Sequence, residues 1–180
     1  MGKQPSIKLS SILNLSKIPS ETRLNGVKRI TKITKNVSQS MLSQITEQVF
    51  VSDYKSTCSK ELLKEKGVDV IINVSCKRSE TTFPKLFHYQ FFFIEDRTDK
   101  NIIKDFKTIA LLVDKHVKNG KRVLIHCRKG ISRAPTFAMA YLILFKGYSY
   151  EKAFDIMKKK HKKSDPNFGF LIQLEKMSNN

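Results

Sequence analysis

Four short runs of β-branched and aromatic residues, separated by longer amphipathic stretches, follow one another from about residue 45 onward. The runs are Gln48–Val51, Val70–Val74, Tyr89–Ile94 and Arg122–His126. Continuous apolar runs of this length are typical of strands that are buried on both faces of a sheet. Strands interleaved with helices predict an α/β fold in which helices flank a mostly parallel central sheet.

Helices are expected between and after these runs. Apolar residues at spacings of three and four mark an amphipathic helix over about 102–117, and Gly120 stands where that helix would end. Further helices are expected over about 59–66, 132–146, 149–162 and 168–178.

The first 43 residues are rich in Ser, Thr, Asn and Lys and show no sustained periodicity. Residues 1–40 carry eight Lys or Arg residues and one acidic residue, so much of the net charge of +18 lies on this arm. A chain of 180 residues suits one ordinary domain. We therefore predict a basic N-terminal extension over residues 1–43 and a single folded domain over residues 44–180.

The N-terminus also matches a lipidation pattern. Gly2 follows the initiator Met and Ser6 supplies the hydroxyl of an N-myristoylation site. One acyl chain binds a membrane only marginally, but the basic arm would supply the second, electrostatic signal. Gly2 is thus a lipidation candidate, and an anionic membrane surface is a candidate partner.

The three cysteines, Cys58, Cys76 and Cys127, are widely spaced and form no Cys-x-x-Cys pair. This pattern argues against a disulfide framework or a zinc ribbon and favours a reducing, intracellular setting. No apolar run approaches the length that spans a bilayer. We expect a cytoplasmic protein, with attachment to the inner face of a membrane as a further candidate.

The segment His-Cys-Arg-Lys-Gly-Ile-Ser-Arg, from His126 to Arg133, carries the chemistry. It joins a predicted buried strand to a predicted helix, so its backbone N–H groups would point into one concavity at the positive end of the helix dipole. Such a nest favours an oxyanion and would lower the pKa of Cys127. Arg133 could return to the rim and bind two phosphate oxygens.

These parts predict a reaction. A thiolate beneath a bound phosphate monoester can attack phosphorus in line and form a phosphocysteine that water hydrolyses. The leaving group then needs a proton. Asp96 is the candidate donor, because it follows the apolar run that ends at Ile94. Its rivals are Glu95, which would point to the other side of an extended chain, and Asp99, which is well placed to cap a helix that begins near residue 101.

This arrangement resembles the signature of the dual-specificity branch of the cysteine-dependent protein tyrosine phosphatases: His-Cys, five residues, Arg. The resemblance covers about residues 45–178 and has a collinear context beyond the loop. That context comprises Asn73-Val74, Glu95-Asp96, Ala134-Pro135-Thr136, the stretch Pro166–Phe170, and Gln173-Leu174.

The resemblance implies a cysteine phosphatase fold and a protein phosphatase that accepts phosphotyrosine and phosphoserine or phosphothreonine in a shallow pocket. Cys127 would be the nucleophile, Arg133 the phosphate clamp and Asp96 the general acid and then base. His126 would orient the loop and help to hold Cys127 as a thiolate. No metal or organic cofactor belongs to this chemistry. The implied substrate-binding residues are Arg128, Lys129, Gly130, Ile131 and Ser132.

One position departs from the family pattern. The residue after the signature Arg is usually Ser or Thr, whose hydroxyl helps the thiolate to leave, whereas this chain has Ala134. The second step is therefore expected to be slow unless Ser132 supplies a hydroxyl. This departure motivates a first alternative function, a phosphate-binding module with low turnover.

A second alternative is a phosphatase of phosphoinositides or of RNA 5′ ends, motivated by the net charge of +18 and by Arg128 and Lys129 in the loop. Nucleic acid is the less favoured partner, because no aromatic stacking platform accompanies the basic residues. The run Lys158–Lys163 could steer acidic substrates or contact an anionic membrane, or only complement a helix dipole.

The remaining titratable residues receive no strong assignment. His88, His116 and His161 have neither partners nor ligand spacing, so we assign them no role. Cys58 is expected to be a small buried or half-buried residue. Cys76 lies just beyond a predicted strand, and by resemblance to phosphoinositide phosphatases it is a candidate for a disulfide with the nucleophile.

Overall fold

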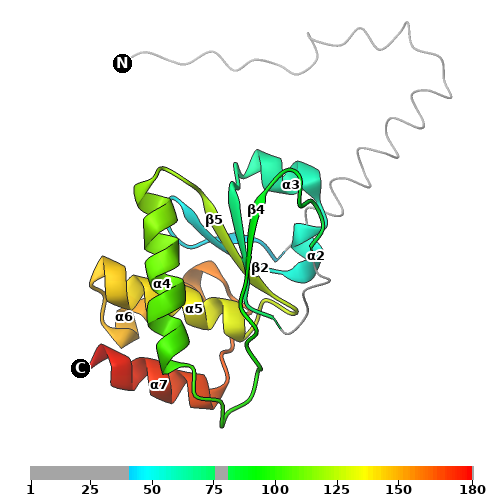
Figure 1. Ribbon diagram of the computed structural model, residues 1–180. Coiled ribbons are helices and arrows are strands. Elements are labelled where there is room, and N and C mark those ends of the chain that lie inside the picture. Colours follow the sequence, from blue (N-terminus) through cyan, green and yellow to red (C-terminus); the bar gives the residue numbers. More distant parts are fainter. Residues whose placement is uncertain (1–40, 76–80, 180) are drawn as a thin grey trace, which may run out of the picture. The chain divides into compact units, whose positions relative to one another are not determined.

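A five-stranded sheet lies at the centre of the computed structural model, which describes residues 41–75 and 81–179 (Figure 1). The strand order is β1-β2-β5-β3-β4, and of the strand pairs within the described ranges only β1–β2 is antiparallel. The strands are β1 (Ser43–Gln44), β2 (Val49–Asp53), β3 (Val70–Asn73), β4 (His88–Phe91) and β5 (Val123–Cys127). The predicted α/β fold with a mostly parallel sheet is confirmed.

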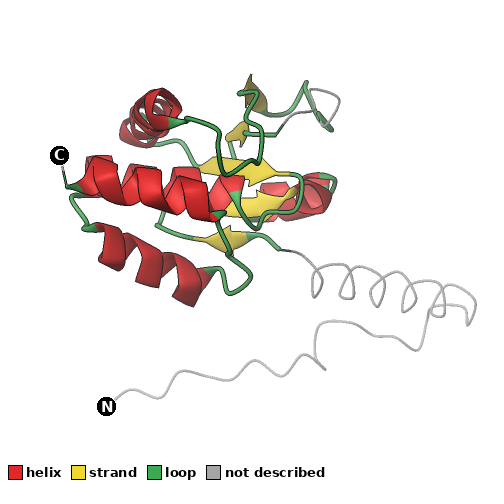
Figure 2. Cartoon of the chain, turned by 90° about the horizontal axis from the view of Figure 1, so that it is seen from below, coloured by secondary structure: helices red, strands yellow, loops and turns green. Residues whose placement is uncertain are grey.

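Helices cover both faces of the sheet (Figure 2). The larger layer consists of α4 (Ile103–Lys118), α5 (Arg133–Lys146), α6 (Tyr150–Lys160) and α7 (Phe168–Ser178). The short α2 (Tyr54–Thr57) leads into α3 (Lys60–Glu65), and α3 packs on the opposite face. None of the helices in the described part of the chain is long and apolar enough to span a bilayer.

Alternate residues of each central strand enter different cores, as the period of a strand requires. In β5, Val123, Ile125 and Cys127 belong to the larger core beneath α4 to α7. Leu124 belongs to the smaller core, which it shares with Leu63 of α3. The side chain of Cys127 therefore lies at the end of β5 on the face that α5 covers.

Helix α5 is the most deeply buried helix among the described residues, with every position from Arg133 to Ile143 buried. Phe137 of α5 packs edge-on against Phe106 of α4, with ring centroids 5.8 Å apart. Interiors packed in this way resist displacement, so the start of α5 is held firmly. Arg133 is the first residue of that helix.

The predicted elements are present, with ends that differ by a few residues. Strand β4 departs most, because it spans His88–Phe91 rather than residues 89–94 and is half exposed. The expectation of burial on both faces was wrong here, since β4 lies at the edge of the sheet and, among the described strands, pairs only with β3. Strand β1 and helix α2 were not predicted, because two and four residues are too short to display a period.

The predicted burial of Cys58 was also wrong, since its side chain is exposed at the end of α2. Gly2 and nearly all of the predicted N-terminal extension lie outside the described residues. Cys76, the candidate disulfide partner, lies outside them too. These interpretations stay predictions.

Candidate active site

The loop between β5 and α5 lies at the edge of the sheet where the carboxyl ends of the parallel strands meet. Cys127 is the last residue of β5 and pairs in register with Asp53 of β2. On the other side of β5, the backbone N–H of Val74 donates to the carbonyl of His126 at 2.9 Å. Loops at this edge commonly form binding sites in open α/β sheets.

A hollow of about 750 Å³ opens above this loop. Cys127, Arg133 and Asp96 all line it, so the structure brings the three predicted catalytic residues together. The segment Asp165–Phe168, which leads into α7, forms another part of the wall. The volume suits a small ligand or the side chain of a larger one.

Cys127 is only 1% exposed, although it lines the hollow. Burial raises the pKa of the Cys127 thiol. The backbone N–H groups of Ala134 and Gly130 and the charge of Arg133 act in the opposite direction without reversing the effect. The predicted lowering of the pKa was therefore wrong for this structure, because removal of the sulfur from water outweighs the surrounding positive charge.

Arg133 is held in place by contacts with the segment that follows β4. Its Nη1 donates to the carbonyl of Ile94 at 2.9 Å, and its Nε lies 3.4 Å from Oδ2 of Asp96. The side chain is 10% exposed. A guanidinium fixed in this way is oriented before any phosphate arrives, which is the arrangement that stabilises transferring charge most effectively.

Asp96 accepts two hydrogen bonds at Oδ1. Ser132 donates through Oγ at 2.7 Å, and Asn167 donates through Nδ2 at 2.8 Å. The backbone N–H of Asn167 in turn donates to Ser132 Oγ at 3.1 Å. These bonds tie the carboxyl group of Asp96 both to the loop and to the start of α7.

The two rivals of Asp96 are engaged elsewhere. Glu95 pairs with Lys100 at 3.4 Å, and Asp99 forms a two-pronged ion pair with Arg97. The prediction that Asp99 caps the following helix was wrong, because the N-cap of α4 is Ile102 and receives no side-chain cap.

Gly130 is required by the local geometry of the loop. Its φ of 70° lies in the left-handed region, and an added Cβ would stand 2.7 Å from the backbone nitrogen of Asp53. Its neighbours Arg128 and Lys129 are exposed at the rim of the hollow, whereas Ile131 is half-buried in its wall. The loop thus presents two cations outward while its centre packs closely against β2.

His126 cannot contribute a positive charge near neutral pH. Its side chain is fully buried, and burial lowers its pKa to about 4. The implied role in which His126 helps to hold the thiolate thus finds no support as an electrostatic effect. Its implied role in orienting the loop stays a prediction.

Two residues near the hollow were missed by sequence analysis. Asn167 lies in a stretch that supported the resemblance, but no role was assigned to it. His161 was set aside as having no partner, and this was wrong: the residue is 2% exposed, and its ring nitrogens contact Gly130 and Ser43. No spacing of residues in the sequence predicts such contacts, because they join elements that are distant in the sequence.

The basic run Lys158–Lys163, which begins in the last turn of α6, is not uniformly free in solvent. Nζ of Lys158 donates to the carbonyl of Ser164, and Nζ of Lys160 donates to the carbonyl of Ile45. Part of this run therefore holds the end of α6 in place. Lys159, Lys162 and Lys163 are exposed.

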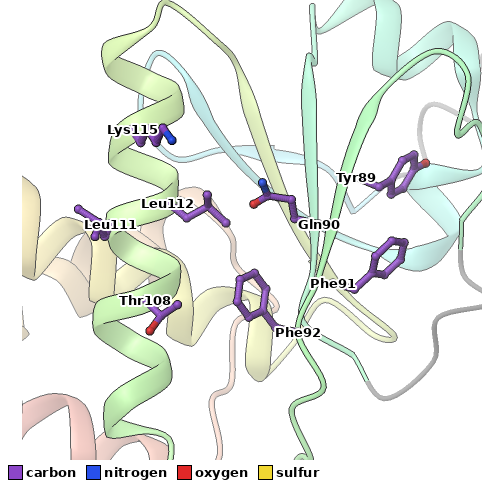
Figure 3. A pocket seen from close by; sticks show the side chains of 8 residues that line it. All are labelled: Tyr89, Gln90, Phe91, Phe92, Thr108, Leu111, Leu112 and Lys115. Carbon is purple, nitrogen blue, oxygen red and sulfur yellow. The ribbon is translucent and has the colours of Figure 1, made fainter.

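A second hollow of about 510 Å³ lies between β4 and α4 (Figure 3). Phe92 and Leu112 face each other across it, and Leu111 and Lys115 of α4 lie farther out. The described residues that line it include neither a cysteine nor a carboxylate. The chemistry predicted from the sequence therefore belongs to the hollow at the β5–α5 loop.

Comparison with known proteins agrees with this geometry. The family model described as "Dual specificity phosphatase, catalytic domain" matches residues 49–180. The chain is 37% identical over 114 residues to human dual specificity protein phosphatase 5, a match that covers 63% of this chain and 29% of that protein. It is 31% identical over 156 residues to dual specificity protein phosphatase PHS1 of Arabidopsis thaliana, covering 83% of this chain and 17% of that protein.

Among solved structures, the chain is similar to the human tyrosine phosphatase-like serine/threonine/tyrosine-interacting protein. The TM-score is 0.69 at 28% identity, with 77% of this chain and 95% of that chain covered. The chain spans less than a third of the length of the two curated relatives named above.

The buried, neutral state of His126 predicts a specific acid sensitivity. Because the pKa of this group is about 4 in the folded protein and about 6.5 when unfolded, its contribution to stability is complete above the unfolded value and is lost as pH falls toward the folded value. Between pH 7 and about pH 4.5 the wild type should lose about 2–3 kcal/mol of unfolding free energy through this group. Urea denaturation of wild type and His126→Asn at both pH values measures the difference. Equal losses in the two proteins would contradict the prediction.

Proposed function

The chain belongs to the dual specificity phosphatase family, and we propose that it hydrolyses phosphotyrosine and phosphoserine or phosphothreonine in proteins through a phosphocysteine intermediate. The observation that carries the proposal is the convergence of Cys127, Arg133 and Asp96 on one hollow at the β5–α5 loop. The chain spans only a fraction of the length of its curated relatives, so the activities of those complete proteins are not assigned to it.

In the first step, the Cys127 thiol releases its proton to solvent water, and the resulting thiolate attacks phosphorus opposite the ester oxygen. The S–P bond forms as the P–O bond to the substrate breaks. Asp96 gives its proton to the departing oxygen, which leaves as a neutral hydroxyl group. Arg133 and the N–H groups of the loop stabilise the negative charge on the three remaining phosphoryl oxygens.

In the second step, Asp96 is a carboxylate and takes a proton from a water molecule. The water oxygen attacks phosphorus, the S–P bond breaks and Cys127 leaves as a thiolate. Ser132 and Asn167 support this exchange of roles, because both donate to Oδ1 of Asp96 and so hold its orientation.

A specific observation favours a second candidate function, a phosphate-binding module with low turnover. Ala134 offers no hydroxyl to the departing sulfur, and the Ser132 hydroxyl is already donated to Asp96. One structural relative is named as a tyrosine phosphatase-like protein. The enzymatic reading remains the better supported, because nucleophile, clamp and acid are all present around the hollow.

We also propose that the protein is cytoplasmic and associates with the inner face of a membrane through its N-terminal arm. This proposal rests on the pattern around Gly2 and on the basic residues of segment 1–40. The exposed Lys159, Lys162 and Lys163 would add to the electrostatic attraction.

The proposed reaction predicts that phosphopeptides are the preferred substrates and that the sulfur of Cys127 is the nucleophile. A panel of phosphotyrosine and phosphothreonine peptides, phosphoinositides and triphosphorylated RNA should show highest kcat/KM for the peptides. Cys127→Ser should lower this activity by at least about 10³-fold, since the nucleophile is lost. Cys58→Ser, which alters the exposed thiol instead, should keep wild-type activity. Equal rates for wild type and Cys127→Ser, or a preference for lipid or RNA, would contradict the proposal.

The absence of a hydroxyl at position 134 predicts slow breakdown of the phosphoenzyme. Stopped-flow assays should show a burst of released alcohol or phenol followed by a slower steady state. Ala134→Ser should raise the steady-state rate about 10-fold and reduce the burst, because a hydroxyl can donate to the departing sulfur. Linear turnover from the first cycle, unchanged in Ala134→Ser, would refute this expectation.

The membrane proposal predicts a covalent change at the N-terminus. Mass spectrometry of protein from its native cell should show Met1 removed and a myristoyl group on Gly2. A Gly2→Ala variant, which cannot be acylated, should lose its association with vesicles that contain anionic lipid. An unmodified or merely acetylated native N-terminus would end the proposal.

A further inference from the structure

A buried histidine links the phosphate-binding loop to the edge of the sheet. His161 follows the end of α6 and is 2% exposed. Its Nε2 lies 2.7 Å from the carbonyl oxygen of Gly130, and its Nδ1 lies 2.8 Å from Oγ of Ser43 in β1. Both ring nitrogens are therefore satisfied, each by a different element.

The chemistry of the two partners determines the tautomer. The Gly130 carbonyl can only accept a hydrogen bond, so Nε2 of His161 must carry a hydrogen. Burial lowers the pKa of His161, which outweighs the opposing effects of the Gly130 carbonyl and Asp53, while Lys163 adds to the lowering. The ring is neutral near neutral pH, and its bare Nδ1 accepts a hydrogen bond from the Ser43 hydroxyl.

The bond to Gly130 constrains a peptide unit of the loop. In a planar trans peptide the carbonyl and the next N–H point in opposite directions, so the N–H of Ile131 points away from His161. The following peptide is held in the same manner, since the backbone N–H of Asp165 donates to the carbonyl of Ile131 at 2.8 Å. Two successive carbonyls are thus held by the segment after α6, which leaves two successive N–H groups directed to the other side. Successive N–H groups of this kind form an anion-binding nest.

We propose that His161 is a positioning residue that orients the Gly130–Ile131 peptide so that the N–H of Ile131 faces the bound phosphoryl group. Ser43 selects the tautomer of His161 that can do so. This inference rests on the proposed function, because it assigns these N–H groups to the phosphoryl oxygens of the substrate. It adds a residue from β1 and one from the end of α6 to the determinants of phosphate affinity.

A purely structural role for His161 can be separated from this one. The end of α6 is also attached to the sheet by Lys160, whose Nζ donates to the carbonyl of Ile45 at 2.8 Å. That bond joins the same region to the β1–β2 connection without involving the loop. Lys160→Met therefore serves as a matched control that loses a comparable tertiary hydrogen bond.

The test compares two amides at position 161. In His161→Gln the side-chain N–H₂ can reach the position of Nε2 and donate to Gly130. In His161→Asn the amide ends near the position of Nδ1 and cannot reach Gly130. Inorganic phosphate binding, measured by calorimetry, should weaken about 10-fold in His161→Asn and stay within about threefold of wild type in His161→Gln and Lys160→Met. Unfolding free energies measured in parallel show whether each variant is folded.

The outcomes divide clearly. Wild-type phosphate affinity in folded His161→Asn, or equal weakening in His161→Asn and His161→Gln, would overturn the proposal. If His161→Asn does not fold, Ser43→Ala keeps the histidine and should weaken phosphate binding about threefold. Unchanged phosphate affinity in Ser43→Ala would overturn the proposal.

The ring-nitrogen chemical shifts of His161 provide an independent test of the tautomer. A neutral ring protonated at Nδ1 would also overturn the proposal. Phosphate binding that depends on His161 without any peptide turnover would support this inference and defeat the proposed function.

Discussion

The parallel pairing of β5 with β2 on one side and β3 on the other holds the reactive end of the molecule in place. His126 pairs with Asn73 on one edge and Cys127 pairs with Asp53 on the other, so β5 is paired on both edges up to His126 and on the β2 edge up to its last residue. At the other end of the loop, α5 is buried from its first residue onward. Because both ends are fixed, five intervening residues determine how sulfur and guanidinium are placed around the hollow.

The charge states of the groups in the site depend on how deeply the end of β5 is buried. Burial lowers the pKa of His126 and raises the pKa of Cys127, so burial favours the neutral form of both groups. The carboxylate of Asp96 also raises the pKa of Cys127, whereas Arg133 lowers it. A thiol of higher pKa is less often ionised, but its thiolate is the stronger nucleophile. Water does not solvate the buried thiolate of Cys127. Its negative charge must therefore be stabilised by backbone amide groups and by Arg133.

Much of this arrangement could be predicted from the sequence, and for physical reasons. The period of the apolar residues revealed the central strands and the long helices, since both elements bury a continuous face. The spacing from Cys127 to Arg133 located the loop, and Asp96 was chosen because it follows a strand run. Local pattern was sufficient for strands and helices that show a period, and for residues such as Asp96 that follow a recognisable strand run.

The remainder depended on contacts between distant segments. The bonds of Asn167 to Asp96 and of His161 to Gly130 cross 71 and 31 positions, so no local pattern encodes them. The pKa of Cys127 was mispredicted because a motif displays nearby charges but does not display the depth of burial. Strand β4 was expected to be buried because its apolar residues resemble those of a central strand, whereas its place at the edge is a property of the whole sheet.

The account rests on a covalent bond between one sulfur atom and phosphorus. Rapid denaturation of the protein during turnover of a phosphotyrosine peptide, followed by mass spectrometric peptide mapping, tests that bond directly. A phosphoryl group on the peptide that contains Cys127, absent when position 127 is Ser, is the predicted result. A phosphoryl group on any other side chain, or steady turnover by the serine variant, would contradict the account.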